Sequence, residues 1–176
     1  GLNDLKQDIY SSIINADDVT ENDITRIYVL TNDGARLFFS NNISFEHFLS
    51  ENVYITTVEE LNQLQEVNNI IQGIDSNYFN ITYSSDLKTN QILNIRMVFS
   101  TKNNKIIEET YALLENIIKA KCFEGVHLTR GFYKNQSVIQ IGTATKDRAI
   151  ERAEKIIGVP KDSMMRIGDC GDYCGN

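Results

Sequence analysis

The sequence predicts an α/β fold in which helical and extended segments alternate along the whole chain. Apolar residues recur at helical spacing in four segments, and runs of β-branched and aromatic residues bounded by turn residues lie between them. No internal repeat or low-complexity linker interrupts this order. With 176 residues, 41% hydrophobic and 23% charged, the chain has the composition of one globular domain, or of a small domain plus part of another.

The first part of the chain is expected to form a helix, a hairpin and a second short helix. The turn Asn32-Asp33-Gly34 indicates the hairpin, and Ser44 is placed to cap the short helix. In order, the predicted elements are a helix at 2–14, a loop at 15–23, strands at 24–30 and 36–39, a short helix at 44–49, and a strand or extended entry at 53–56.

The remainder alternates long helices with pairs of strands. A capping box at Thr57-Val58-Glu59-Glu60 starts the first of these helices, and Gly158 with Pro160 ends the last. The predicted elements are helices at 57–71, 105–119 and 145–157, and strands at 78–84, 91–99, 126–130, 137–142 and 164–167. The final strand, helix and strand have the length of a parallel crossover.

Charge and hydropathy exclude some classes of partner. The formal net charge of -7 leaves no electrostatic footprint for nucleic acid or an anionic membrane. The apolar runs are too short to span a bilayer and no leader opens the chain, so a cytoplasmic location is expected. Cys122, Cys170 and Cys174 are expected to be free thiols, because Cys170 and Cys174 have no histidine or third cysteine near them in sequence to complete a zinc site.

The start of the last helix is a candidate anion site. Thr145 and Lys146 stand at this position, so the Lys146 ammonium can reach a phosphate, and the free amides of the first turn can help to hold an anion. The alternative is a solvated lysine beside Asp147 and Arg148.

Carboxylates follow the last predicted strand. Asp169 comes directly after Ile167-Gly168, Asp172 lies three residues later, and Asn176 ends the sequence. Mg²⁺ prefers such oxygen ligands, and the carboxyl edge of a strand is where α/β proteins bind phosphate and metal. A polar turn without a ligand is the alternative, but Lys146, on the helix that returns to this strand, favours a site.

These segments resemble a known family. The runs Thr145-Lys146-Asp147-Arg148-Ala149-Ile150, Ile156-Ile157-Gly158-Val159-Pro160 and Met165-Arg166-Ile167-Gly168-Asp169 resemble the third and fourth motifs of the haloacid dehalogenase (HAD) superfamily of phosphatases. The closest likeness is to the branch with a large α/β cap inserted in the core. The segment Tyr28-Val29-Leu30-Thr31-Asn32-Asp33-Gly34-Ala35 is similar to the strand and turn that precede this cap.

The resemblance implies an inserted α/β cap domain plus part of a Rossmann-like core. Residues 1–42 would be a partial core and the entry to the cap, residues 43–131 the cap, and residues 132–176 the C-terminal part of the core.

The resemblance also implies roles for individual residues. Lys146 would be catalytic and stabilise the charge of a phosphoaspartate, and Asp169 would bind Mg²⁺. The second acidic ligand would be Asp172 or a residue beyond Asn176. Asn176 and Thr145 would contact the substrate.

One part of the family's machinery is absent from this sequence. These enzymes attack phosphate with the first aspartate of an Asp-x-Asp motif, and no Asp-x-Asp occurs here. We therefore expect a fragment of a Mg²⁺-dependent phosphohydrolase that acts on small phosphorylated metabolites, such as sugar phosphates, through an aspartyl-phosphate. This chain alone is expected to be inactive, and its partners would be the metabolite and the missing N-terminal part of the protein.

Two further expectations complete the sequence-based picture. His47 and His127 are each alone in sequence and are expected in the core or on the surface rather than in catalysis, whereas Arg130 and Tyr133 are candidates to face a substrate under a closed cap. The alternative function is a non-catalytic α/β binding or regulatory module with a cation-binding acidic loop.

Overall fold

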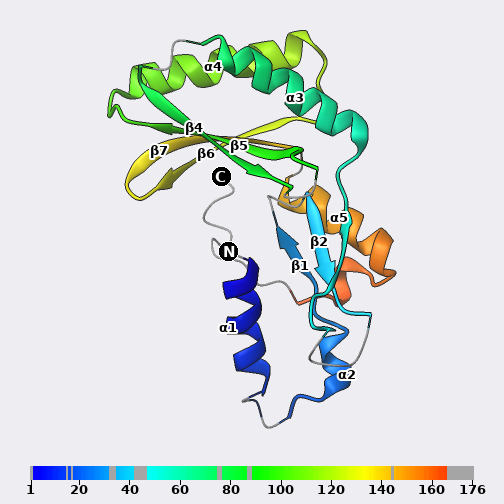
Figure 1. Ribbon diagram of the computed structural model, residues 1–176. Helices are drawn as coiled ribbons and strands as arrows, with labels where there is room; N and C mark the ends of the chain where they lie inside the picture. The colour runs from blue at the N-terminus through cyan, green and yellow to red at the C-terminus, as the bar shows by residue number, and fades with distance from the viewer. Residues whose placement is uncertain are drawn as a thin grey trace.

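The computed structural model in Figure 1 describes residues 2–14, 16, 18–31, 35–41, 47–74, 77–86, 89–143 and 145–165. It confirms the predicted α/β class, and the strands form two antiparallel sheets. The elements in chain order are α1 (Leu2–Ile14), α2 (Glu21–Ile24), β1 (Val29–Thr31), β2 (Arg36–Phe39), β3 (Glu51–Tyr54), α3 (Val58–Gln72), β4 (Phe79–Ser85), β5 (Ile92–Phe99), α4 (Asn104–Ala120), β6 (His127–Tyr133), β7 (Gln136–Gly142), α5 (Lys146–Ile157) and the 3₁₀ turn η2 (Lys161–Ser163).

Strands β1, β2 and β3 form a small antiparallel sheet with helices on both faces, here called the three-stranded unit. On one face, Leu37 and Ile55 pack against Ala149 and Ala153 of α5. On the other face, Val29 of β1 and Phe38 of β2 pack against α1 and α2. The helices contribute Ile9, Tyr10 and Ile13 from α1 and Ile24 from α2. The alternation of side chains along β2 explains why one short strand contributes to both clusters.

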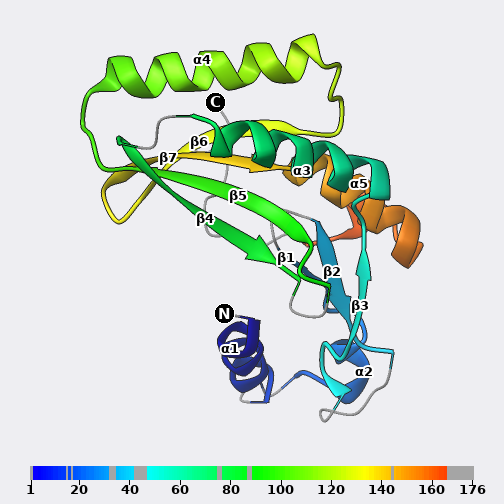
Figure 2. The same cartoon turned by 45° about the horizontal axis from the view of Figure 1, so that its top comes forward.

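Strands β4 to β7 form a second antiparallel sheet in the order β4-β5-β7-β6, here called the four-stranded unit. Helices α3 and α4 cover one of its faces, and the opposite face looks toward α1, β1 and β2 (Figures 1 and 2). The main core lies between the sheet and these two helices. It includes Leu64, Val67, Ile71, Phe79, Ile95, Met97, Phe99, Ile107, Leu114, Ile139 and Ile141, all buried.

The chain passes between the two units twice, at residues 55–57 and again at residues 143–145. The two passages lie side by side, because the buried hydroxyls of Thr56 and Thr143 are hydrogen-bonded at 2.8 Å. A second link joins the units where Arg36 of β2 pairs with the buried carboxylate of Asp86 at 2.8 Å. The junction is therefore fastened by polar contacts as well as by packing.

Several predicted boundaries need correction near the N-terminus. The predicted loop at 15–23 contains the start of α2, and the predicted strand at 24–30 begins only at Val29. The reason is a local cap: the backbone N and the hydroxyl of Thr20 both donate to Asp23, at 2.9 and 2.7 Å, while Ile24 is fully buried on this turn. The predicted hairpin is confirmed, because β1 and β2 pair antiparallel.

The prediction that the strand at residues 137–142 begins a parallel crossover is wrong, because this strand, β7, has only antiparallel neighbours. This strand lies between β5 and β6 and is antiparallel to both, so no further strand can pair beside it. A two-residue turn at Lys134 and Asn135, both with positive φ, forms the β6–β7 hairpin instead. Of the predicted strand 164–167, residues 164 and 165 are not in a strand, and the other two lie outside the described residues.

The division into cap and core remains a prediction, but the predicted boundary between residues 131 and 132 does not fall between secondary-structure elements. A boundary between residues 131 and 132 would fall inside β6, which pairs with β7 along its whole length. The segment from α3 to β7 contains this whole sheet and both helices that cover it. Among the described residues, no helix combines the length and the apolar character needed to cross a membrane.

Candidate functional site

The predicted anion site at the start of α5 forms a standard helix N-terminus. Thr145 is extended and exposed, and its hydroxyl accepts a hydrogen bond from the Arg148 amide at 3.3 Å. Lys146 is the first helical residue, and its side chain lies outside what the structure describes. The structure thus places both residues where the chain re-enters the three-stranded unit, next to the free amides of the first turn.

The acidic residues predicted to bind the metal fall outside the described part of the chain. These are Asp169 and Asp172, and the predicted substrate contact Asn176 falls there too. Within the described residues, no group of three or more histidine, cysteine, aspartate or glutamate side chains could hold a metal ion. The Mg²⁺ site therefore remains a prediction that rests on the sequence.

A threonine that the sequence analysis did not select lies at the end of β1. The Oγ1 atom of Thr31 is buried and has no hydrogen-bond partner among the described residues. A buried hydroxyl without a partner costs about 1–3 kcal/mol, so such a group calls for a ligand or another part of the chain to complete its bond. The signal available in the sequence was the position of Thr31, at the end of a strand and directly before a glycine-containing turn.

An ionic cluster around the buried Glu60 joins α3 of one unit to α5 of the other, and sequence reasoning did not find it. The Glu60 carboxylate, 5% exposed, pairs with Arg152 at 2.5 Å and with Arg148 at 3.0 Å. The amide of Thr57 donates to the same carboxylate at 2.8 Å, which completes the predicted capping box of α3. Burial raises the pKa of Glu60, but the Arg152 and Thr57 hydrogen bonds and the two arginine charges outweigh burial and hold this pKa below its ordinary value.

His127 belongs to the same cluster. Its Nε2 atom lies 3.2 Å from Arg148 Nη1, and because a guanidinium only donates, Nε2 is the acceptor and the imidazole is neutral. Burial, and then the Arg148 charge, lower the pKa of His127. This half-buried histidine lies on β6 and contacts α5 through Arg148, and its lack of a catalytic role stays a prediction.

Acidification from about pH 7 to about pH 5 is expected to lower the free energy of unfolding through His127. Since its pKa is lowered in the folded protein, the unfolded chain takes up a proton first, and the stability contributed by neutral His127 is lost as pH falls below the unfolded value of about 6.5. Urea denaturation across this range should show a smaller pH dependence in His127→Gln, which keeps an acceptor for Arg148. Equal pH dependence in both proteins would contradict this expectation.

The two candidates near the β6–β7 hairpin separate onto different faces of the sheet. Arg130 lies over the ring of Tyr111 and pairs with Glu108, both on α4, so it belongs to the helix-covered side. Tyr133, three residues further, lies on the opposite, open face because strand residues alternate.

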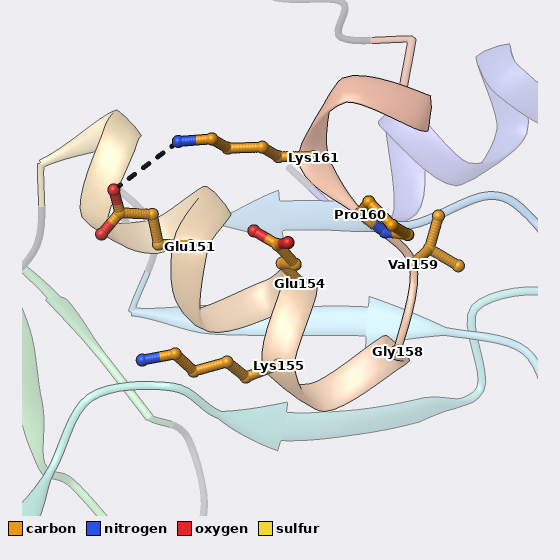
Figure 3. Close-up of a pocket in the computed structure, with 7 residues that line it drawn as sticks. All are labelled: Glu151, Glu154, Lys155, Gly158, Val159, Pro160 and Lys161. Carbon is orange, nitrogen blue, oxygen red and sulfur yellow. Dashed lines mark ion pairs between the residues drawn. The ribbon is translucent and has the colours of Figure 1, made fainter.

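Figure 3 shows an open hollow at the far end of α5 from Lys146. Its lining mixes charges of both signs, with Lys161 Nζ 3.9 Å from Glu151 Oε1. The lining residues are Glu151, Glu154, Lys155, Gly158, Val159, Pro160 and Lys161. Of these, Gly158, Val159 and Pro160 belong to a segment of the family resemblance, and no predicted catalytic, metal-binding or substrate-binding residue is among the described residues that line the hollow.

Comparison of the chain with protein-family models, with curated proteins and with solved structures finds no match.

Proposed function

We propose that the protein to which this chain belongs is a Mg²⁺-dependent phosphohydrolase of the HAD type that acts on small phosphorylated metabolites through an aspartyl-phosphate. The observation that carries the proposal is the position of Lys146. It is the first residue of a helix that begins as the chain returns to the three-stranded unit, and the segment around it resembles the lysine motif of that family. A lysine at a helix N-terminus combines its own charge with the free amides of the first turn, which suits a phosphate.

The proposal gives each site residue a role. Lys146 offsets the negative charge that develops on the phosphoryl group, and the Thr31 hydroxyl, which lacks a partner among the described residues, donates a hydrogen bond to a phosphate oxygen. Thr145 contacts the substrate beside its capping bond to Arg148. The attacking aspartate is not in this sequence, so residues outside it would supply the nucleophile.

The donor set fits Mg²⁺ by its chemistry. Asp169 and Asp172 offer carboxylate oxygens and Asn176 an amide oxygen, which are the hard ligands that Mg²⁺ takes together with water. When bound, Mg²⁺ would neutralise charge on the phosphate.

In this proposal the four-stranded unit is the cap. It is connected to the rest of the chain by two adjacent passages, at residues 55–57 and 143–145, which is the arrangement that an inserted domain requires. A cap held in this way can exclude water from the phosphate and select the leaving group. The cap would then extend to the end of β7.

The protein encoded by the complete gene tests the proposal. We expect Mg²⁺-dependent release of phosphate from p-nitrophenyl phosphate, a loss of about 100-fold in kcat for Lys146→Ala, and little change for Lys155→Ala, the matched lysine at the other end of α5. The 176-residue chain alone should release none. Absence of phosphatase activity in the whole protein, or full activity of Lys146→Ala, would refute the proposal.

A second candidate function is supported by one observation. The strands after Val126 lie in a sheet in which β7 already has two neighbours, so this sheet needs no missing strand. A non-catalytic binding or regulatory module with a cation-binding acidic loop would have such a self-contained sheet. The same assay separates the two candidates, because only the enzyme releases phosphate.

A further inference from the structure

The open face of the four-stranded sheet is polar, whereas its other face is covered by helices. Along β5, Ile95 and Met97 are fully buried against α3 and α4, and Arg96 between them points to the open face. The register places Arg96 directly opposite Thr82 of β4 and Gln140 of β7, and Gln140 opposite Thr129 of β6. One row of hydrogen-bonding side chains therefore crosses all four strands.

Arg96 is the charge at the centre of this row. Arg96 is half-buried and has no carboxylate partner among the described residues. Its guanidinium carbon lies over the ring of Tyr133, 5.5 Å from the ring centroid. The other arginine of the sheet, Arg130, is neutralised by Glu108 on the helix-covered side. A half-buried guanidinium without an anion retains most of its capacity to bind one.

No acidic side chain on the strands of this sheet offsets the charge of Arg96. None of the four strands contains an aspartate or glutamate, although the chain has 24 acidic residues and a net charge of -7. Lys134, in the hairpin turn, lies 5.4 Å from the same Tyr133 ring. The strands of this sheet and the β6–β7 turn thus carry basic side chains and no acidic one, which favours an anionic ligand on the open face.

This face also looks toward the three-stranded unit, the side on which Thr31 ends β1 (Figures 1 and 2). A small molecule held by its phosphate at that unit would present its remaining atoms to the row Thr82, Arg96, Gln140 and Thr129. Such a row offers one cation for an acidic group and neutral donors and acceptors for hydroxyls.

We propose that Arg96 determines specificity by binding a second acidic group, a carboxylate or a phosphate, on the part of the substrate that is not transferred, with Gln140 and Thr82 contacting its hydroxyls. This assignment rests on the proposed function, because that function supplies the phosphate held at the other end. The preferred substrates are therefore small phosphorylated metabolites with two acidic groups.

Binding to the 176-residue chain in the presence of Mg²⁺ tests the proposal with two matched pairs of ligands. 3-Phosphoglycerate differs from glycerol 3-phosphate by a carboxylate, and fructose 1,6-bisphosphate differs from fructose 6-phosphate by a phosphate. In at least one pair, titration calorimetry should show about tenfold tighter binding of the ligand with two acidic groups, and the pair that shows it identifies the second group.

Arg96→Gln should abolish this preference and leave the affinity of the ligand with one acidic group unchanged. Arg130→Gln is the matched control, since it removes the same charge from the opposite face and should preserve the preference. Circular dichroism establishes that each variant is folded, and ¹⁵N chemical shifts should change at Gln140 and Tyr133 with the preferred ligand.

The outcomes separate this inference from the function on which it rests. Equal binding within both pairs, or equal weakening of both ligands by Arg96→Gln, would overturn the role of Arg96 and leave the phosphohydrolase proposal standing. If none of the four ligands binds to this chain, the role of Arg96 is overturned, and the phosphatase assay on the whole protein decides the proposed function.

Discussion

Replacing Glu60 with alanine is expected to destabilise the protein by about 3 kcal/mol, because it removes a buried carboxylate that pairs with two partly buried arginines. Glu60 is 5% exposed and holds Arg152 and Arg148, 92 and 88 positions away in sequence, together with the Thr57 amide. Arg152 is further fixed by its hydrogen bond to the carbonyl of Ile55 at 2.9 Å. Loss of the carboxylate should therefore weaken the cap of α3 and the junction between the two units together.

The matched control is Glu59→Ala, one residue earlier in the same helical turn. Glu59 is exposed, so its removal should cost under about 1 kcal/mol. Urea denaturation followed by circular dichroism measures both variants. Glu60→Gln keeps the shape of the side chain and gives an intermediate value if the alanine variant fails to fold. A similar loss for Glu59→Ala and Glu60→Ala would show that the buried cluster contributes nothing special.

The second large effect is expected at the centre of the core, where Ile95→Ala should cost about 2–5 kcal/mol. Ile95 lies on β5, between β4 and β7, and is fully buried under α3 and α4. Truncation removes packed methyl groups from a place where strands on both sides limit any collapse of the cavity.

Ile156→Ala provides the comparison with the same change of side chain. Ile156 is 46% exposed near the end of α5, so a loss below about 1 kcal/mol is expected. Urea midpoints should separate the two variants while the slope of the transition stays constant. A small loss for Ile95→Ala would contradict the position of the main core between the four-stranded sheet and its helices.

Local signals in the sequence predicted most elements of the fold. The capping box at Thr57 and Glu60 starts α3 as expected, and Gly158, with φ of 70°, ends α5. These signals work because caps and turns depend on hydrogen bonds within a few residues. The wrong start of the strand predicted at residues 24–30 shows the limit of local signals. The apolar Ile24 fits either a strand or the buried side of a short helix, and only its packing in the fold decides between the two.

Some residues of the candidate site could be recognised from local sequence patterns, and others only from the tertiary structure. Thr145 and Lys146 could be recognised because a helix start is a local pattern, and the side chain of Thr145 caps the helix as such a position requires. Thr31, Glu60 and Arg96 could not be selected in advance, because their importance comes from a missing partner, a distant partner and a cross-strand row respectively.

The amino-acid sequence was sufficient for the α/β class, the major helices and strands, and the start of α5, since periodicity and capping act over short distances. Tertiary structure alone decided that β7 lies between two antiparallel strands and that Glu60 meets Arg152 across the junction. It also decided that Arg96 stands without a carboxylate among the described residues. Strand order and ion pairing depend on which distant segments share a surface, and hydrophobic burial selects that arrangement over the whole chain.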